Sequence, residues 1–161
     1  MTEIHETILE IDLNKLANNF NYLKSKLKPN TKIIAVVKAY AYGHGDIVIA
    51  RYLEKLGAHA LWVADFEEGT RLRKSGVKIP IIIANPGTKS TQEIIDNKLD
   101  VVIYNSELLH LYGTLDVDIR IHIKFDTGMN RYGFDTSEVE SVVADLQKYP
   151  KLKIQSICSH L

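Results

Sequence analysis

A lysine that ends the longest apolar run in the first quarter of the chain is the first residue placed for chemistry. Residues 33–37 are all apolar, four of them β-branched, and Lys38 follows directly. Such a run predicts a parallel strand buried on both faces, and ligand sites in such folds lie at the carboxyl ends of strands. A partly desolvated lysine there can attack a carbonyl carbon and form a Schiff base. The alternative is a lysine whose ammonium group simply reaches water.

Tyr42 and the glycine turn behind it form a second group with chemical potential. Tyr42 stands four residues after Lys38 and directly before Gly43-His44-Gly45. A turn between a strand and a helix exposes backbone N–H groups that can help to hold one phosphate, although the third glycine of the dinucleotide fingerprint is missing. The Tyr42 side chain either contacts such a phosphate or only packs beside the turn.

In a later predicted strand, over residues 118–125, every second side chain is polar, and the alternation continues to the residue that follows the strand. This polar set comprises Arg120, His122, Lys124 and Asp126, and it points away from the face that carries the alternating apolar residues. If helices cover the apolar face, the polar face meets solvent in an open sheet or the interior near the mouth of a closed barrel. The second arrangement requires partners for these charges, because unpaired buried charges are costly.

His160 lies at the carboxyl end of the last predicted strand. A lone histidine is usually a satisfied core or surface residue, and the six histidines include no pair at ligand spacing on a helix. Because Cys-x-x-Cys is also missing, we expect no metal site. The single cysteine, Cys158, cannot form an internal disulfide, and its apolar neighbours favour core packing over a reactive thiol.

The composition is that of an ordinary globular domain. The chain has 161 residues, of which 45% are hydrophobic and 25% charged. Twenty basic residues balance twenty acidic ones, so nothing favours a nucleic acid or an anionic membrane as partner and a small molecule is the better expectation. Neither a basic-then-apolar leader nor a long apolar span occurs, and we expect a cytoplasmic protein.

Hydrophobic periodicity predicts one continuous alternation of strands and helices. An opening strand is expected at 6–11, followed by a helix that Asp12 caps and Pro29 ends. Further strands are expected at 33–37, 60–64, 79–83, 101–103, 118–125 and 152–159, and helices at 46–56, 66–74, 90–97, 106–112 and 137–148. These six strands, separated by short helices, indicate βαβ units in a parallel sheet. Glu67 and Glu68 start a helix, where acidic residues suit the dipole, and need no catalytic role.

Two segments far apart in the chain resemble segments of the bacterial alanine racemases. Ala-Val-Val-Lys-Ala-x-Ala-Tyr-Gly-His-Gly around Lys38 resembles the pyridoxal-phosphate segment of that family, with Tyr40 where aspartate is common. The segment from Lys124 to Gly133 resembles the family pattern Lys-x-Asp-Thr-Gly-Met-x-Arg-x-Gly. The resemblance runs along nearly the whole chain.

The resemblance implies a role for each of five residues. Lys38 would carry pyridoxal 5′-phosphate and act as one catalytic base, and Tyr42 would bind the phosphate. Arg131 would contact the phenolic oxygen of the cofactor and the carboxylate of the substrate, held in place by a carbamylated Lys124. His160 would lie between an arginine at the pyridine nitrogen and the second catalytic tyrosine. The catalytic set would thus be Lys38, Arg131 and His160.

The fold and reaction that the resemblance implies are those of the family. Residues 1–161 would be the amino-terminal portion of an α/β fold, a parallel (β/α) barrel of the TIM type, with about six of its eight βα units. The reaction would be interconversion of L- and D-alanine for peptidoglycan by two bases, in a homodimer. Because the rest of the barrel and a carboxyl-terminal β-domain would be absent, we expect residues 1–161 alone to be inactive.

Two other classes of protein remain open. A non-catalytic pyridoxal-phosphate carrier of similar barrel fold would also place a lysine after its first strand, but would not be expected to have the loop between Lys124 and Arg131. An aldolase-like barrel would form a Schiff base through Lys38 without a cofactor.

Overall fold

The structure, a computed structural model, describes residues 7–160, which alternate helices and parallel strands. The strands are β1 (Ile34–Val36), β2 (Ala60–Val63), β3 (Ile81–Ile83), β4 (Asp100–Ile103), β5 (Ile119–Lys124) and β6 (Leu152–Cys158). The helices are α1 (Leu13–Ser25), α2 (Lys38–Tyr42), α3 (Asp46–Lys55), α4 (Phe66–Lys74), α5 (Thr91–Asp96), α6 (Ser106–Gly113) and α7 (Val139–Lys148), with a short 3-10 turn, η1 (Thr136–Glu138), before α7. The predicted alternation is therefore confirmed from the first helix onward.

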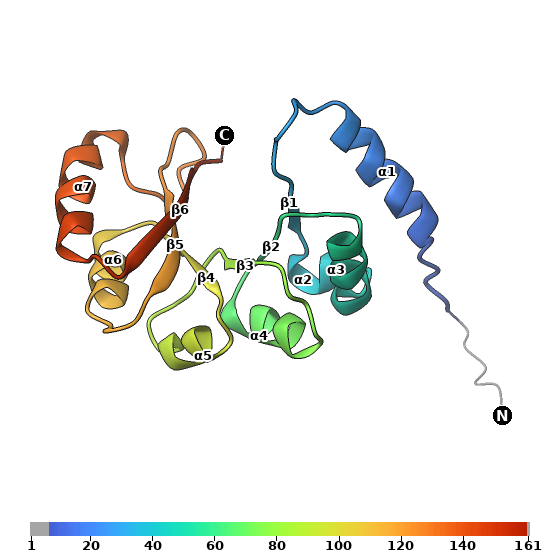
Figure 1. Ribbon diagram of the computed structural model, residues 1–161, viewed down its shortest axis with the longest axis horizontal. Helices are drawn as coiled ribbons and strands as arrows, with labels where there is room; N and C mark the ends of the chain where they lie inside the picture. Colours follow the sequence, from blue (N-terminus) through green and yellow to red (C-terminus); the bar gives the residue numbers. More distant parts are fainter. Residues whose placement is uncertain (1–6, 161) are drawn as a thin grey trace.

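All six strands belong to one sheet in the order β1-β2-β3-β4-β5-β6, and each pairs in parallel with its neighbour in the sequence. The strands follow an arc, and α3 to α7 lie along its outer side (Figure 1). Consecutive βα units in this arrangement build the wall of a (β/α) barrel. The described residues form part of such a wall, as the α/β prediction required.

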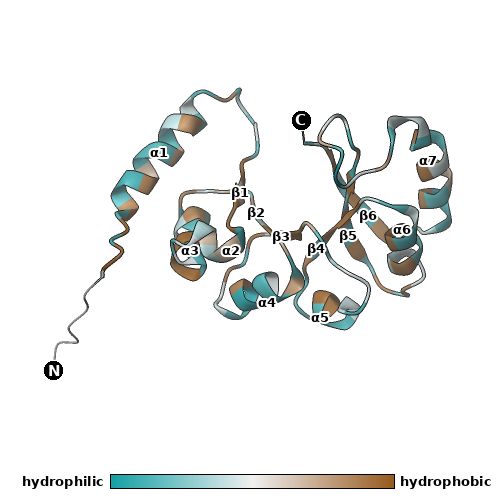
Figure 2. Ribbon diagram, turned by 180° about the vertical axis from the view of Figure 1, so that it is seen from behind, coloured by the Kyte–Doolittle hydropathy of each residue, from teal (hydrophilic) through white to brown (hydrophobic). Residues whose placement is uncertain are grey.

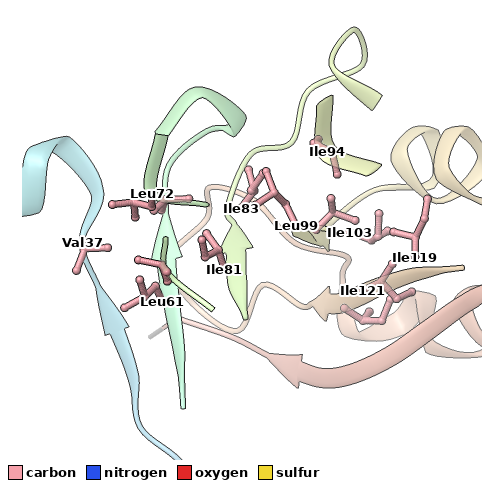
Figure 3. Packing of buried hydrophobic residues seen from close by; sticks show 14 of the residues in the cluster. Val37, Leu61, Leu72, Ile81, Ile83, Ile94, Leu99, Ile103, Ile119 and Ile121 are labelled. Carbon is pink, nitrogen blue, oxygen red and sulfur yellow. The ribbon is translucent and has the colours of Figure 1, made fainter. Parts of the chain in front are cut away.

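The main core lies between the sheet and these helices. Figure 3 shows buried side chains of the strands, such as Leu61, Ile81 and Ile121, beside Leu72 and Ile94 from the helices. In Figure 2 the strands are largely brown, whereas each helix carries both teal and brown residues, as expected of helices with one face on the core. A second small cluster, Ala60, Ile82 and Val102, lies on the other face of the sheet.

The first predicted strand is wrong over the residues that the structure describes, since residues 7–11 are irregular; Glu6 lies outside them. Ile8 and Leu9 are both 68% exposed, so neither the β-branched side chain of Ile8 nor the hydropathy of the two residues leads to strand pairing. The helix cap after this segment is confirmed. Asp12 Oδ1 accepts hydrogen bonds from the backbone N–H groups of Asn14 and Lys15, at 2.9 and 3.2 Å.

The burial predicted for the strand before Lys38 is also wrong. Ile34 and Val36 in β1 are 41% and 46% exposed, although Val37 behind them is buried. β1 is at one edge of the sheet, and its concave face has no opposing strand among the described residues. The strand that is buried on both faces is β3, whose three isoleucines are almost completely buried.

The polar parity of β5 faces away from the helices, and two of its members, Arg120 and His122, are paired there with Asp100. Asp100, only 2% exposed, accepts a hydrogen bond from Arg120 Nε at 2.7 Å, and its second oxygen lies 3.4 Å from His122 Nε2. The other ring nitrogen of His122 lies 2.7 Å from Ser156 Oγ in β6. Asp126, the last member of the predicted set, lies beyond the end of β5 in the following loop.

Candidate functional site

A cavity of about 660 Å³ opens at the carboxyl ends of the strands. It is lined by all five residues to which the family resemblance gives a role: Lys38, Tyr42, Lys124, Arg131 and His160. They come from the turn after β1, the end of β5, the loop after β5 and the segment after β6. The fold thus brings together residues that lie more than a hundred positions apart in the sequence.

The lining of the cavity has a distinct charge and shape. Lys38, Lys124 and Arg131 supply three cationic groups, and no carboxylate occurs among the described residues that line the cavity. Trp62 and two alanines, Ala64 and Ala84, form apolar wall at the ends of β2 and β3. Such a lining suits a small anionic molecule whose charged groups meet the basic side chains and whose flat ring lies against the apolar wall.

The turn that carries Lys38 and Tyr42 is the segment labelled α2, and its backbone is left-handed. Ala39, Tyr40, Ala41 and Tyr42 have φ between 51° and 56°, a conformation that costs an L-residue roughly 1–2 kcal/mol. Backbone hydrogen bonds close it at each end, since Ala41 N–H donates to Val37 O and Gly43 N–H donates to Ala39 O, both at 3.0 Å. The sequence predicted a glycine turn but not that four residues before it would be left-handed. Strain of this kind concentrates at functional sites.

Arg131 lies in a loop whose base is closed by backbone pairing. Asp126 N–H donates to Phe134 O, and Phe134 N–H donates to Lys124 O, each at 2.9 Å. Asp126 Oδ1 accepts hydrogen bonds from the backbone N–H groups of Gly128 and Asn130, at 3.1 and 3.0 Å, and these bonds lower the pKa of the Asp126 carboxyl. The aspartate therefore shapes the loop and does not line the cavity.

Lys124 is buried at the end of β5, with 9% of its surface exposed. Its Nζ lies 3.5 Å from Phe125 O, so this amine has only a weak acceptor on its own loop. Lys124 and Arg131 both line the cavity, as expected of residues that act on one ligand. Carbamylation of Lys124 stays a prediction.

The end of β6 contributes Cys158, Ser159 and His160. Ser159 Oγ hydrogen-bonds to Thr127 Oγ1 and so joins this end to the loop of Arg131. Cys158 is half-buried and lines the cavity, so its predicted packing in the core is only partly realised. Burial raises the pKa of the Cys158 thiol, which favours the unreactive protonated form.

Sequence reasoning missed a set of residues that support the site. Tyr104, directly after β4, donates its hydroxyl hydrogen to Asn85 Oδ1 at 2.8 Å and stacks on Tyr132, next to Arg131. Glu68 in α4 accepts a hydrogen bond from the backbone of Ala39. Asn85 and Tyr104 could have been recognised from the sequence, because each follows a predicted strand and side chains at the carboxyl ends of strands face the ligand.

No group of three or more metal-binding side chains occurs within residues 7–160. None of the helices in these residues is long and apolar enough to cross a membrane.

The sequence and the fold of this chain are similar to those of known alanine racemases. Residues 11–161 match the sequence model of the family described as alanine racemase, N-terminal domain. An alanine racemase from Nostoc sp. is 38% identical over 161 residues, which cover 95% of this chain and 42% of that protein. The solved alanine racemase from Corynebacterium glutamicum has a TM-score of 0.88 at 31% identity, covering 94% of this chain and 45% of that one.

A further solved structure, the alanine racemase of Clostridium difficile 630 in complex with cycloserine, has a TM-score of 0.86 at 31% identity. The match covers 92% of this chain and 43% of that one. The chain spans less than half the length of the curated relatives it matches.

Proposed function

Because the chain belongs to the alanine racemase N-terminal domain family, we propose that it is the cofactor-binding part of a pyridoxal-phosphate-dependent enzyme that interconverts L- and D-alanine. The observation that carries the proposal is the convergence of Lys38, Tyr42, Lys124, Arg131 and His160 on one cavity. The chain is 38% identical to a relative named alanine racemase, and several solved alanine racemases share its fold. None of these relatives is named as a carrier protein or an aldolase.

The lining residues fit pyridoxal phosphate by charge and by shape. The cofactor has an anionic phosphate, a flat ring that carries a phenolic oxygen, and an aldehyde. The cavity offers the Tyr42 hydroxyl for the phosphate, an apolar wall with the Arg131 cation for the ring, and the primary amine of Lys38 for the aldehyde. When bound, the cofactor would supply an electron sink for the negative charge that develops at the substrate α-carbon. The chain therefore has a partner group for each part of the molecule.

Each residue then has a role that its side chain can perform. Lys38 Nζ would hold the cofactor covalently and, once released, remove or return the α-proton of alanine on one face. The Tyr42 hydroxyl would hold the phosphate. The expected help from the glycine turn is wrong, because the backbone N–H groups of Gly43, His44 and Gly45 already donate to backbone carbonyl oxygens of the left-handed turn. Arg131 would bind the substrate carboxylate through its guanidinium fork and contact the cofactor phenolic oxygen, and Lys124, carbamylated, would orient it. His160 would help to place the ring.

The complete enzyme requires parts beyond these residues. We propose that the complete enzyme also contains the remaining barrel strands and a carboxyl-terminal β-domain, outside residues 1–161. A partner subunit of a homodimer would bring the second base. The supporting observation is that the relatives are more than twice as long as the matched segment. We further propose that the enzyme is cytoplasmic and supplies D-alanine for peptidoglycan.

Attachment of the cofactor can be mapped chemically. The full-length protein is loaded with pyridoxal phosphate, reduced with borohydride to fix the cofactor to its lysine, and digested for peptide mapping. The label is expected on Lys38 alone, and Lys38→Arg should lose it. Label on Lys124, or spread over several lysines, would contradict the assignment.

A further inference from the structure

The carboxylate of Glu68 ties together two loops at the candidate site. Glu68 Oε1 accepts a hydrogen bond from the backbone N–H of Ala39 at 2.7 Å, and Oε2 accepts one from the N–H of Ala64 at 2.8 Å. Ala39 directly follows Lys38, and Ala64 lines the cavity after β2. One side chain of α4 thus fixes the loop after β1 against the loop after β2.

The first of these bonds meets a need created by the left-handed turn. Ala39 is the first of four residues with positive φ, and its N–H lies 29 positions from the carboxylate that accepts it. A hydrogen bond to a charged acceptor is roughly twice as strong as one between neutral groups. Glu68 therefore stabilises the strained turn at the residue next to Lys38.

A second residue of α4, Arg71, also contacts this turn. Arg71 lies one helical turn after Glu68, and its guanidinium carbon is 4.6 Å from the centroid of the Tyr40 ring. Arg71 Nε and Nη2 also donate to Asp46 Oδ2, at 2.9 and 2.6 Å. Since Asp46 is buried at the start of α3, the cation over Tyr40 is itself anchored.

We propose that Glu68 is a positioning residue: it holds the left-handed turn so that Lys38 and Tyr42 both reach into the cavity, an inference that rests on the function proposed above. Glu68 does not line the cavity, so it acts through Ala39 and not on the ligand. Its neighbour Glu67 shares the first turn of α4 but lines an outer hollow beside Phe66 and Lys74. A role in the helix dipole alone would make the two glutamates equivalent.

Backbone hydrogen exchange in the full-length protein tests the contact without any cofactor. Glu68→Ala should speed exchange of the Ala39 amide by about tenfold, the scale of one charge-assisted hydrogen bond. Glu68→Gln, which keeps one acceptor oxygen, should be intermediate, and Glu67→Ala should leave the Ala39 amide unchanged. Equal exchange of Ala39 in Glu68→Ala and Glu67→Ala would overturn the inference.

Cofactor attachment and kinetics test the consequence for Lys38. In Glu68→Ala the rate of borohydride-trapped labelling of Lys38 should fall by about tenfold, and kcat should fall similarly while KM for alanine changes less than about twofold. Thermal unfolding of Glu68→Ala and Glu67→Ala is the control. A general loss of folding would lower the melting temperature and speed amide exchange throughout the chain, whereas loss of the Glu68 contact alone should speed exchange at Ala39.

The outcomes separate the inference from the function on which it rests. If wild-type protein takes no label on Lys38, the proposed function fails, while exchange at Ala39 still decides whether Glu68 holds the turn. If the wild type is labelled and Glu68→Ala is labelled at the same rate, the proposed function stands and the positioning role is wrong.

Discussion

Tyr104 stacks on Tyr132 with ring centroids 4.6 Å apart, which places the loop of Arg131 against the end of β4. The Tyr104 hydroxyl donates to Asn85 Oδ1 at 2.8 Å, so the same side chain also reaches the end of β3. Burial raises the pKa of Tyr104, and the hydroxyl remains a donor at neutral pH. The loop therefore depends on two strands besides β5, from which it starts.

Replacing Tyr104 separates its two interactions. Tyr104→Phe removes the hydrogen bond to Asn85 but keeps the stacked ring, and should lower the free energy of unfolding by about 1 kcal/mol or less. Tyr104→Ala also removes the stacking on Tyr132 and should cost at least ~1 kcal/mol more. Urea denaturation measures both changes. Equal losses in the two variants would show that the stacked rings contribute nothing.

Gly133 should tolerate no side chain. A Cβ there would lie 2.3 Å from the backbone nitrogen of Asp126, and φ is +145°. Gly133→Ala should therefore lower the free energy of unfolding by about 1–3 kcal/mol and open the base of the Arg131 loop. Gly128→Ala is the matched control and should be milder, since a Cβ added there would meet no atom within 4 Å outside Gly128 and its two chain neighbours. Thermal unfolding of both variants checks the order.

Loop order should depend on pH through Asp126. Backbone hydrogen bonds, first of all from Gly128, lower the pKa of Asp126 in the folded state. The stabilisation is therefore complete above the unfolded pKa of about 3.9 and is lost as the pH falls through the lower folded value. Amide chemical shifts of Gly128 and Asn130 should follow this loss. In Asp126→Asn the same shifts should be independent of acidic pH, and an unchanged titration there would refute the assignment.

Cys158 should react slowly with alkylating reagents at neutral pH. Burial raises its pKa, so the thiolate fraction is smaller than in free cysteine and grows only in alkaline solution. Iodoacetamide rates over a pH series, with urea-unfolded protein as control, measure this difference. Because Cys158 lines the cavity, pyridoxal phosphate should slow the reaction further. A neutral-pH rate equal to that of unfolded protein would contradict the burial.

Removing Lys124 tests its proposed support of Arg131. In the complete enzyme Lys124→Ala should reduce kcat/KM, and short carboxylates such as acetate should restore part of it, because they would replace the oxygens of the proposed carbamate toward Arg131. Lys124→Arg, which stays cationic, should not respond to carboxylates. Wild-type kinetics in Lys124→Ala would limit this lysine to a structural role.

The amino-acid sequence by itself determined the order of helices and strands from the first helix onward, because apolar periodicity reports local structure. It also placed Lys38 and Lys124 at or beside the carboxyl ends of strands, and the glycine-rich segments behind them identified the family. A parallel sheet brings such ends to one edge, so the meeting of these two lysines at the cavity followed from local signals and topology.

Only the tertiary structure decided which distant groups satisfy one another. The left-handed turn at Ala39 depends on Glu68, 29 residues away, which the sequence presented as a helix-dipole residue. Arg120 in β5 donates a hydrogen bond to Asp100 in the neighbouring strand β4, and no local sequence pattern predicts that pair. Likewise, the exposure of Ile34 follows from the position of β1 at the edge of the sheet. Hydrogen bonds and burial of this kind depend on the register and neighbours of whole elements, which periodicity within one segment does not contain.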